Sequence, residues 1–277
     1  MSGPTRVAVV GHVEWLDVAV VEHVPAAGEI VTATSCFELP AGGGAVAAVQ
    51  LRKLAGEALF LTALGDDERA VRAAAELREL HDVELHAATR PRPQRRAFTQ
   101  VDAQAERTIT VLGERLVPHG DDPLPWSRLA DAHAVYLTGS DVAAARAARA
   151  ARVLVATARA ADVLLDGDVL PDVLVASARD PKELAGLDTL SPARWTVLTD
   201  GARGGRWEGA DGSGGTWTAA ALPGPPVDAY GCGDSFAAGL TYGLAAGMAF
   251  DAALALAVRC GAHCLTGRGP YAAQLVL

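Results

Sequence analysis

The sequence predicts an α/β fold in which helices cover both faces of a mostly parallel sheet, and two observations carry this prediction. Short apolar runs alternate with stretches rich in Ala and Leu along most of the 277 residues. About 50% of the residues are hydrophobic and 21% are charged, which is typical of a globular protein with a large core. We expect a single domain over 1–277, because one α/β domain often reaches this length.

The apolar runs predict strands near 6–10, 58–62, 134–137, 153–156, 173–176 and 195–198. Helices are expected at 44–55, 67–80, 141–151, 181–186, 233–247 and 250–265, several of which begin at Gly, Asp or Ser. Two segments break the alternation, 15–39 and 96–112, the second with a polar turn in its middle. We interpret both as β ribbons that together form a small lid over one end of the α/β body.

Composition and charge exclude several classes of protein. The net charge of −9 gives no basis for binding nucleic acid or an anionic membrane surface. The longest uncharged run, 235–250, is too short to span a bilayer, no signal peptide is apparent, and the four cysteines show no Cys-x-x-Cys spacing. We therefore expect a cytoplasmic protein. The only lysines, Lys53 and Lys182, do not follow a glycine, which excludes a P-loop.

The segment 227–239 is the most informative part of the chain for chemistry. Glycines at 231 and 233 allow a sharp entry into a helix, whose first amide groups form a site for an anion. Asp234 lies inside this site, where it would repel a bound phosphate but could take a proton from an attacking hydroxyl during phosphoryl transfer. The simpler alternative is that Asp234 only caps the helix.

Two other enzymatic interpretations of this segment are weaker. A dinucleotide fingerprint needs a third glycine, where this chain has Phe236. A hydrolase elbow would use Ser235 with Asp251 and His263, but the residues between them are predicted to be helical, so no strand end remains for the acid.

Three further segments suit a phosphoryl-transfer site. A strand leads into a glycine-rich turn at 199–205 that could hold nucleotide phosphates. Glycines at 42–44 allow a small ligand to approach the backbone, although a plain tight turn would look the same. Asp17 follows the first strand and could bind paired hydroxyls of a polyol, or be an ordinary surface carboxylate. The basic segment 90–96 is either a solvated loop or a lid loop that contacts phosphate or substrate.

Together these segments resemble the ribokinase-like, or PfkB, family of sugar kinases. The pattern Asp-x-x-Gly-x-Gly-Asp at 228–234 matches the C-terminal signature of the family, and Thr-x-Gly-x-x-Gly at 199–204 matches its nucleotide loop. The run Ala-Gly-Gly-Gly at 41–44, with Gly-Asp-Asp at 65–67, matches its N-terminal region, and Glu-Arg-Thr-Ile at 106–109 matches a common lid strand. Order and spacing agree over nearly the whole chain.

The resemblance implies a role for each matching residue. Asp234 would be the catalytic base, and the amides of Gly231, Cys232 and Gly233 would form the anion hole. ATP would bind at Thr199, Asp200, Gly201, Ala202, Arg203, Gly204 and Val258. The sugar would be held by Asp17, Gly42, Gly43, Gly44 and the residue at position 46. Mg²⁺ would be held through water by Asp180, and a monovalent cation such as K⁺ would bind at Asp228. The resemblance also implies a homodimer through the β lid.

Three positions depart from the family pattern. Val46 stands where the family usually has Asn, and it cannot hydrogen-bond a sugar hydroxyl. The family motif Asn-x-x-Glu is shortened here to Ser177-x-x-Asp180, and the first glycine of the Gly-Gly pair is Ala41. We expect an ATP-dependent kinase that phosphorylates a hydroxymethyl group of a sugar or sugar-like molecule. The alternatives are a silent sugar- or nucleotide-binding relative and a kinase for a nucleoside or an anionic, phosphorylated sugar.

Overall fold

The computed structural model describes residues 5–190 and 193–277 and contains two sheets. The larger sheet has nine strands in the order β13-β12-β11-β10-β9-β8-β1-β4-β5. Strands β5 to β11 of this order pair in parallel, whereas β12 and β13 form an antiparallel hairpin at one edge. Its strands are β1 (Val7–Val10), β4 (Leu59–Leu64), β5 (Glu84–Thr89), β8 (Ala134–Leu137), β9 (Leu154–Thr157), β10 (Val173–Ser177), β11 (Trp195–Thr199), β12 (Gly205–Gly209) and β13 (Gly214–Trp217).

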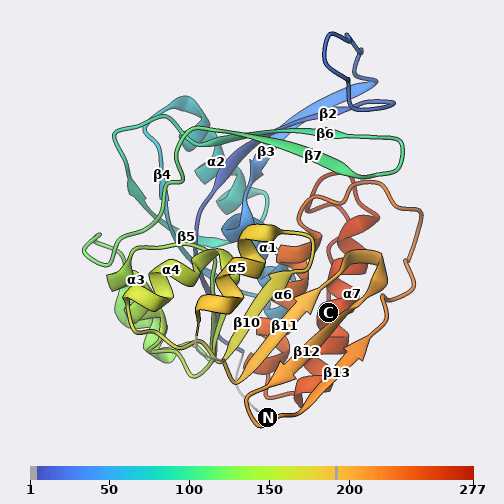
Figure 1. Ribbon diagram of the computed structural model, residues 1–277. Helices are drawn as coiled ribbons and strands as arrows, with labels where there is room; N and C mark the ends of the chain where they lie inside the picture. Colours follow the sequence, from blue (N-terminus) through green and yellow to red (C-terminus); the bar gives the residue numbers. More distant parts are fainter. Residues whose placement is uncertain (1–4, 191–192) are drawn as a thin grey trace.

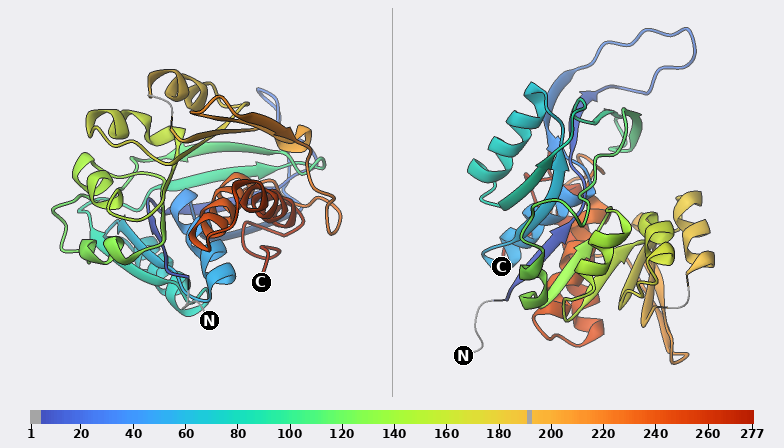
Figure 2. Two further views of the ribbon diagram at one scale, coloured as in Figure 1. Left: turned by 90° about the horizontal axis from the view of Figure 1, so that it is seen from below. Right: turned by 90° about the vertical axis from the view of Figure 1, so that its left-hand side faces the viewer.

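Helices cover both faces of this sheet, which confirms the predicted α/β class (Figure 2). Alternate residues of each parallel strand enter different cores, because successive side chains of a strand point to opposite faces. One core contains residues of α1, α2, α6 and α7, and the other contains residues of α3 and α4. The helices are α1 (Gly43–Ala55), α2 (Glu68–Glu79), α3 (Val142–Ala148), α4 (Ala161–Asp166), α5 (Pro181–Thr189), α6 (Cys232–Ala245) and α7 (Phe250–Leu265).

The second sheet has four strands in the order β3-β2-β6-β7 and lies above the body in Figure 1. Its strands are β2 (Glu14–Val20), β3 (Ser35–Ala41), β6 (Arg96–Val101) and β7 (Arg107–Leu112). The two predicted ribbons therefore exist, and a parallel pairing of β2 with β6 joins them into one sheet. We call this sheet the lid. Within the predicted ribbon 15–39, residues 21–34 form a long loop between the two strands.

All six predicted strands and all six predicted helices are present, within a few residues at their ends. Besides three short 3-10 helices, four elements of the described residues were not predicted: β5, β12, β13 and α4. Strand β5 is polar and lies at a sheet edge, and the β12–β13 hairpin is rich in glycine, so neither has the apolar pattern of a buried strand. Among the described residues, no helix is long and apolar enough to cross a membrane.

Candidate active site

A glycine begins helix α6 and sets the geometry of the loop that the sequence singles out. Gly231 has a φ of 81°, in the left-handed region that favours glycine, and no side chain caps the helix. The first amides of a helix have no partner within it, so those of Cys232 and Gly233 can bind an anion. A β-carbon added at Gly233 would meet nothing within 4 Å, so the surface beside this residue is open.

Asp234 lies in the first turn of α6 and is half-buried. Desolvation raises the pKa of Asp234 to about 6. Glu183 and Glu14 also raise this pKa, whereas Arg107 and Arg159 lower it. A carboxyl group with a pKa not far below neutral is ionised at pH 7 and can still hold a proton briefly, which suits a general base.

The glycine run before α1 brings the backbone up to Asp234. A β-carbon at Gly43 would lie 2.9 Å from Oδ1 of Asp234 and 3.6 Å from Cε1 of His12. Gly42 has a φ of 88°, and its amide donates a hydrogen bond to the hydroxyl of Tyr230. The predicted glycine segment 42–44 and the predicted base Asp234 therefore lie close together, at the N-terminal ends of α1 and α6.

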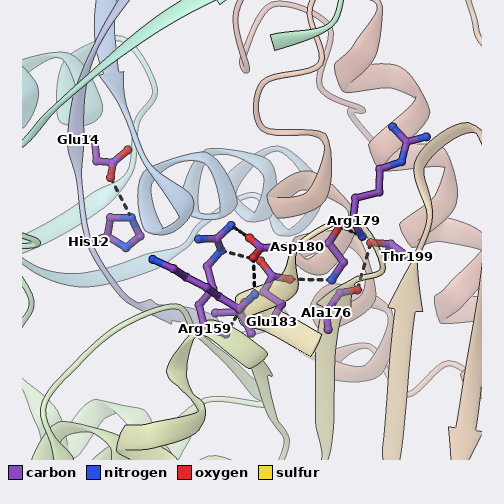
Figure 3. A network of polar contacts seen from close by, with 11 residues as sticks. His12, Glu14, Arg159, Ala176, Arg179, Asp180, Glu183 and Thr199 are labelled. Atoms are coloured by element: carbon purple, nitrogen blue, oxygen red, sulfur yellow. Dashed lines mark hydrogen bonds and ion pairs between the residues drawn. The ribbon is translucent and has the colours of Figure 1, made fainter. Parts of the chain in front are cut away.

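His12 and Glu14 also belong to this site and were not singled out from the sequence. Oε1 of Glu14 lies 3.7 Å from Nε2 of His12, and Figure 3 shows the two side chains facing each other. Burial lowers the pKa of His12 well below its ordinary value, so the imidazole is neutral at pH 7. Burial raises the pKa of Glu14, and nearby arginines lower it. The signal that could have found them is two titratable residues directly after the first strand.

The structure does not bring Asp17 to Asp234. Glu14 and Asp17 lie on the same strand, β2, three residues apart, so they point to opposite faces of the lid. Asp17 accepts a hydrogen bond of 2.8 Å from Nη2 of Arg96 on the neighbouring strand. Its carboxylate is thus engaged with Arg96 on the face of the lid opposite Glu14, and its role in binding the sugar stays a prediction.

Two other predicted residues, Val46 and Asp228, help to hold the turn that leads into α6. Val46 is fully buried, and its Cγ1 would be 3.0 Å from a β-carbon at Gly231, so it packs against the start of α6. Asp228 is buried and accepts hydrogen bonds from the amides of Tyr230 and Gly269, at 2.8 and 3.2 Å. Burial raises its pKa. Asp228 therefore fixes the turn that precedes the helix.

The nucleotide loop predicted at 199–204 connects β11 to β12 and contains a short 3-10 helix, Gly201–Arg203. Gly201 and Gly204 both have positive φ, 57° and 86°. Asp200 forms ion pairs with Arg203 and Arg179, at 2.7 and 3.5 Å. The hydroxyl of Thr199 donates to the carbonyl of Ala176 on β10 and is already engaged, as Figure 3 shows.

A cavity of about 350 Å³ opens beside this loop. Its wall includes Asp200 and Arg203 of the loop and Trp217 of β13. Trp217 stacks on Phe236 of α6 at a ring-centroid distance of 5.8 Å, which links the cavity to the helix that carries Asp234. Val258 lies on α7, half-buried, and is not part of the cavity wall.

Arg159 lies between the carboxylates of Asp180 and Glu183, near the predicted metal position (Figure 3). Its Nε lies 2.6 Å from Oε1 of Glu183, and its Nη2 contacts Asp180. The other oxygen of each carboxylate accepts a backbone amide hydrogen bond, from Ser177 and Lys182 respectively. All four oxygens are engaged, so they form no open cage for direct Mg²⁺ coordination. They fit an ion that keeps its water and is bound mainly by phosphates.

Comparison with known proteins agrees with this arrangement. The family model described as pfkB family carbohydrate kinase matches residues 4–275. No curated protein sequence matches the chain. Among solved structures, the ribokinase of Arabidopsis thaliana, complexed with ribose and ATP, superposes with a TM-score of 0.76 at 19% identity, covering 98% of this chain and 95% of that one.

Two other solved structures show the same fold. The ribokinase of Thermotoga maritima has a TM-score of 0.76 at 16% identity and covers 98% of this chain and 96% of its own. The adenosine kinase of Sinorhizobium meliloti has a TM-score of 0.77 at 16% identity and covers 97% and 96%. At these identities the similarity concerns the fold, which is a ribokinase-like α/β fold with a mostly parallel nine-stranded sheet.

Proposed function

Because this chain belongs to the pfkB family of carbohydrate kinases, we propose that it transfers the γ-phosphoryl group of ATP to a hydroxymethyl group of a sugar or sugar-like small molecule. The observation that carries the proposal is the position of Asp234. It lies in the first turn of α6, beside free helix amides on one side and the glycines that precede α1 on the other.

In this reaction the acceptor oxygen forms a bond to the γ-phosphorus, and the bond from that phosphorus to the bridging oxygen of ADP breaks. Asp234 takes the proton of the acceptor hydroxyl. The amides of Gly231, Cys232 and Gly233 stabilise the charge that develops on the transferred phosphoryl oxygens. Gly43 faces Asp234 and His12 and brings the backbone to the acceptor. Gly42 and Gly44 allow the chain to pack closely against Glu14 and His12, which also belong to the acceptor side of the site.

The nucleotide would bind in the cavity beside the 199–204 loop. Trp217 in the wall of this cavity stacks on Phe236 of α6, the helix that carries Asp234. Mg²⁺, which neutralises charge on the phosphates when bound, would be held through water by Asp180 and Glu183. Asp228 is the candidate residue for a monovalent cation. The proposal includes a homodimer through the lid, whose edge strand β7 exposes Ile109, Val111 and Leu112.

Activity should depend on pH through Asp234. A base must be ionised to accept a proton, so kcat/KM should fall about tenfold per pH unit below the pKa of Asp234, which is about 6, and level off above it. Arg107 lowers this pKa, so Arg107→Gln should move the inflection to higher pH. Initial rates between pH 4.5 and 8 measure both effects. An inflection that Arg107→Gln moves to lower pH, or leaves in place, would contradict the assignment.

Gly201→Val should weaken ATP binding by at least about tenfold and leave acceptor binding nearly unchanged. Its φ of 57° is strained for a branched residue, and its β-carbon would lie 3.1 Å from the guanidinium of Arg179. The matched control is Gly212→Val, which has a φ of 83° and no atom within 4 Å of the added β-carbon. Calorimetric titration with ATP compares the two variants. Equal ATP affinity in both would place the nucleotide elsewhere.

A further inference from the structure

Two arginines lie at the base of the lid, where it joins the body. Arg95 directly precedes β6, and Arg115 follows β7, so they mark the two ends of one hairpin. The chain ends approach each other here, since a β-carbon at Gly113 would lie 3.9 Å from Cα of Arg95. Arg115 packs against Gly139, just beyond β8, where a β-carbon would lie 3.5 Å from its Nη1.

The two arginines differ in what compensates their charge. Nε of Arg95 lies 2.8 Å from Oε1 of Glu14, although its N–H is not directed at that oxygen. Arg115 makes no hydrogen bond or ion pair within residues 5–190 and 193–277. Burial and repulsion by Arg95 lower the pKa of Arg115. Arg115 is half-buried. A partly desolvated guanidinium without an ion pair is stabilised by an anion, so a ligand that pairs with it is expected.

Uncharged polar atoms next to Arg115 also lack partners. Nδ1 of His12 and Oγ1 of Thr138 are buried, and neither has a hydrogen-bond partner in the part of the chain that the structure describes. Thr138 precedes Gly139 at the carboxyl end of β8, and its hydroxyl lies against Gly11 at the end of β1. Buried polar atoms are nearly always paired in proteins, so two such atoms at the carboxyl ends of β1 and β8 suit a ligand that binds there.

The position of these groups in the sheet supports the same conclusion. The chain passes from β1 to β4 on one side and later returns to β8 on the other side of β1. Ligands of open α/β sheets bind at such a switch point, beyond the carboxyl ends of the strands. His12 follows β1 here, and the β-carbon position of Gly43 lies close to both His12 and Asp234. Arg115 lies at the same end of the sheet, because it packs against Gly139 just beyond β8.

Glu14 and Asp234 both favour the charged form of Arg115, but within the described residues no carboxylate forms an ion pair with it. Glu14 lies against Arg95, and Asp180 and Glu183 both pair with Arg159. The guanidinium of Arg115 therefore keeps its hydrogen-bond donors available to an anion from outside the chain.

We propose that the acceptor carries an anionic group, a carboxylate or a phosphate, which Arg115 binds with Arg95 beside it, while its hydroxyl faces Asp234. A guanidinium binds either anion through two parallel hydrogen bonds. This inference rests on the proposed function, since it names the substrate class of the same site. His12 and Thr138 supply hydrogen bonds to the uncharged part of the same ligand.

Calorimetric titration with two matched pairs tests this inference directly: D-glucitol against D-gluconate for a carboxylate, and D-fructose against D-fructose 6-phosphate for a phosphate. We expect one anionic member to bind about 10- to 100-fold more tightly than its neutral counterpart, the range expected for charged hydrogen bonds. The pair that discriminates identifies the anion. Equal binding within both pairs, or no detectable binding of any of the four, would overturn the inference.

Arg115→Gln should abolish this preference and Arg115→Lys should retain part of it. Because the wild-type side chain is a half-buried cation without an ion pair, Arg115→Gln should melt at the same or a higher temperature, whereas a purely structural arginine would lower the melting temperature when removed. The control is Arg96→Gln, which removes a cation paired with Asp17 on the opposite face of the lid. It should keep the preference. A preference that survives Arg115→Gln, or disappears only in Arg96→Gln, would overturn the inference.

The experiments distinguish failure of the proposed anion site from failure of the proposed kinase activity. Acceptor-dependent ADP release with neutral sugars, unchanged by Arg115→Gln, would overturn the anion site and leave the kinase activity standing. Preferential binding of an anion that Arg115→Gln removes, without turnover of any acceptor, would support the anion site and overturn the kinase activity.

Discussion

Asp234→Asn is expected to lower kcat by about 10²–10⁴, the range for loss of a general base, while ATP still binds. The amide has the same shape as the carboxylate but cannot accept the proton of the acceptor hydroxyl. Because the pKa of Asp234 is raised by desolvation, a neutral side chain there should not destabilise the fold. Steady-state kinetics, calorimetry with ATP and a melting curve measure the three quantities.

A matched control distinguishes the loss of a proton acceptor from the loss of a negative charge at a helix N-terminus. Asp251 occupies the first turn of α7, just as Asp234 occupies the first turn of α6, but it is exposed. Asp251→Asn removes the same charge from a helix start and should leave kcat unchanged. If Asp234→Asn retained the wild-type rate, or if the two variants behaved alike, Asp234 would not be the base.

Gly43→Ala should lower kcat/KM by about 100-fold. The new β-carbon would lie 2.9 Å from Oδ1 of Asp234, so the carboxylate must move. A shift of about 1 Å at a reacting group can cost about this much in rate. The change also fills space on the acceptor side, so KM should rise while the affinity for ATP stays nearly the same.

The control for Gly43→Ala is Gly224→Ala, whose β-carbon would have only an ordinary contact of 3.9 Å, to Thr266. Its kinetics should match those of the wild type. Normal kcat/KM in Gly43→Ala would show that the acceptor does not approach Asp234 over this glycine, and the acceptor side of the site would have to be placed elsewhere.

The sequence predicts the body of the fold well because its strands are buried on both faces. Such strands are continuous apolar runs, as in Val7–Val10 and Leu154–Thr157, and they are recognisable without tertiary information. The edge strand Glu84–Thr89 has a polar sequence because one side of it has no neighbouring strand, and no local signal distinguishes it from a loop.

The parts of the site that a single continuous segment forms could be predicted from the sequence. The turn before α6 and the nucleotide loop are local glycine motifs whose backbone geometry follows from the residues themselves. The lid is different, because a strand that begins one residue earlier or later presents the other set of side chains. Glu14 and Asp17 therefore point to opposite faces of the lid. Arg115 was not singled out because only tertiary packing brings it to Gly139.

The central claim is that this protein transfers the γ-phosphoryl group of ATP to a hydroxyl of a small molecule. The most direct measurement incubates it with Mg²⁺ and ATP labelled with ³²P at the γ position, together with neutral sugars, sugar acids, sugar phosphates or nucleosides. The account predicts acceptor-dependent ADP release, with the label on the organic acceptor, and loss of both in Asp234→Asn. Tight ATP binding without label on any acceptor of these four classes would contradict it.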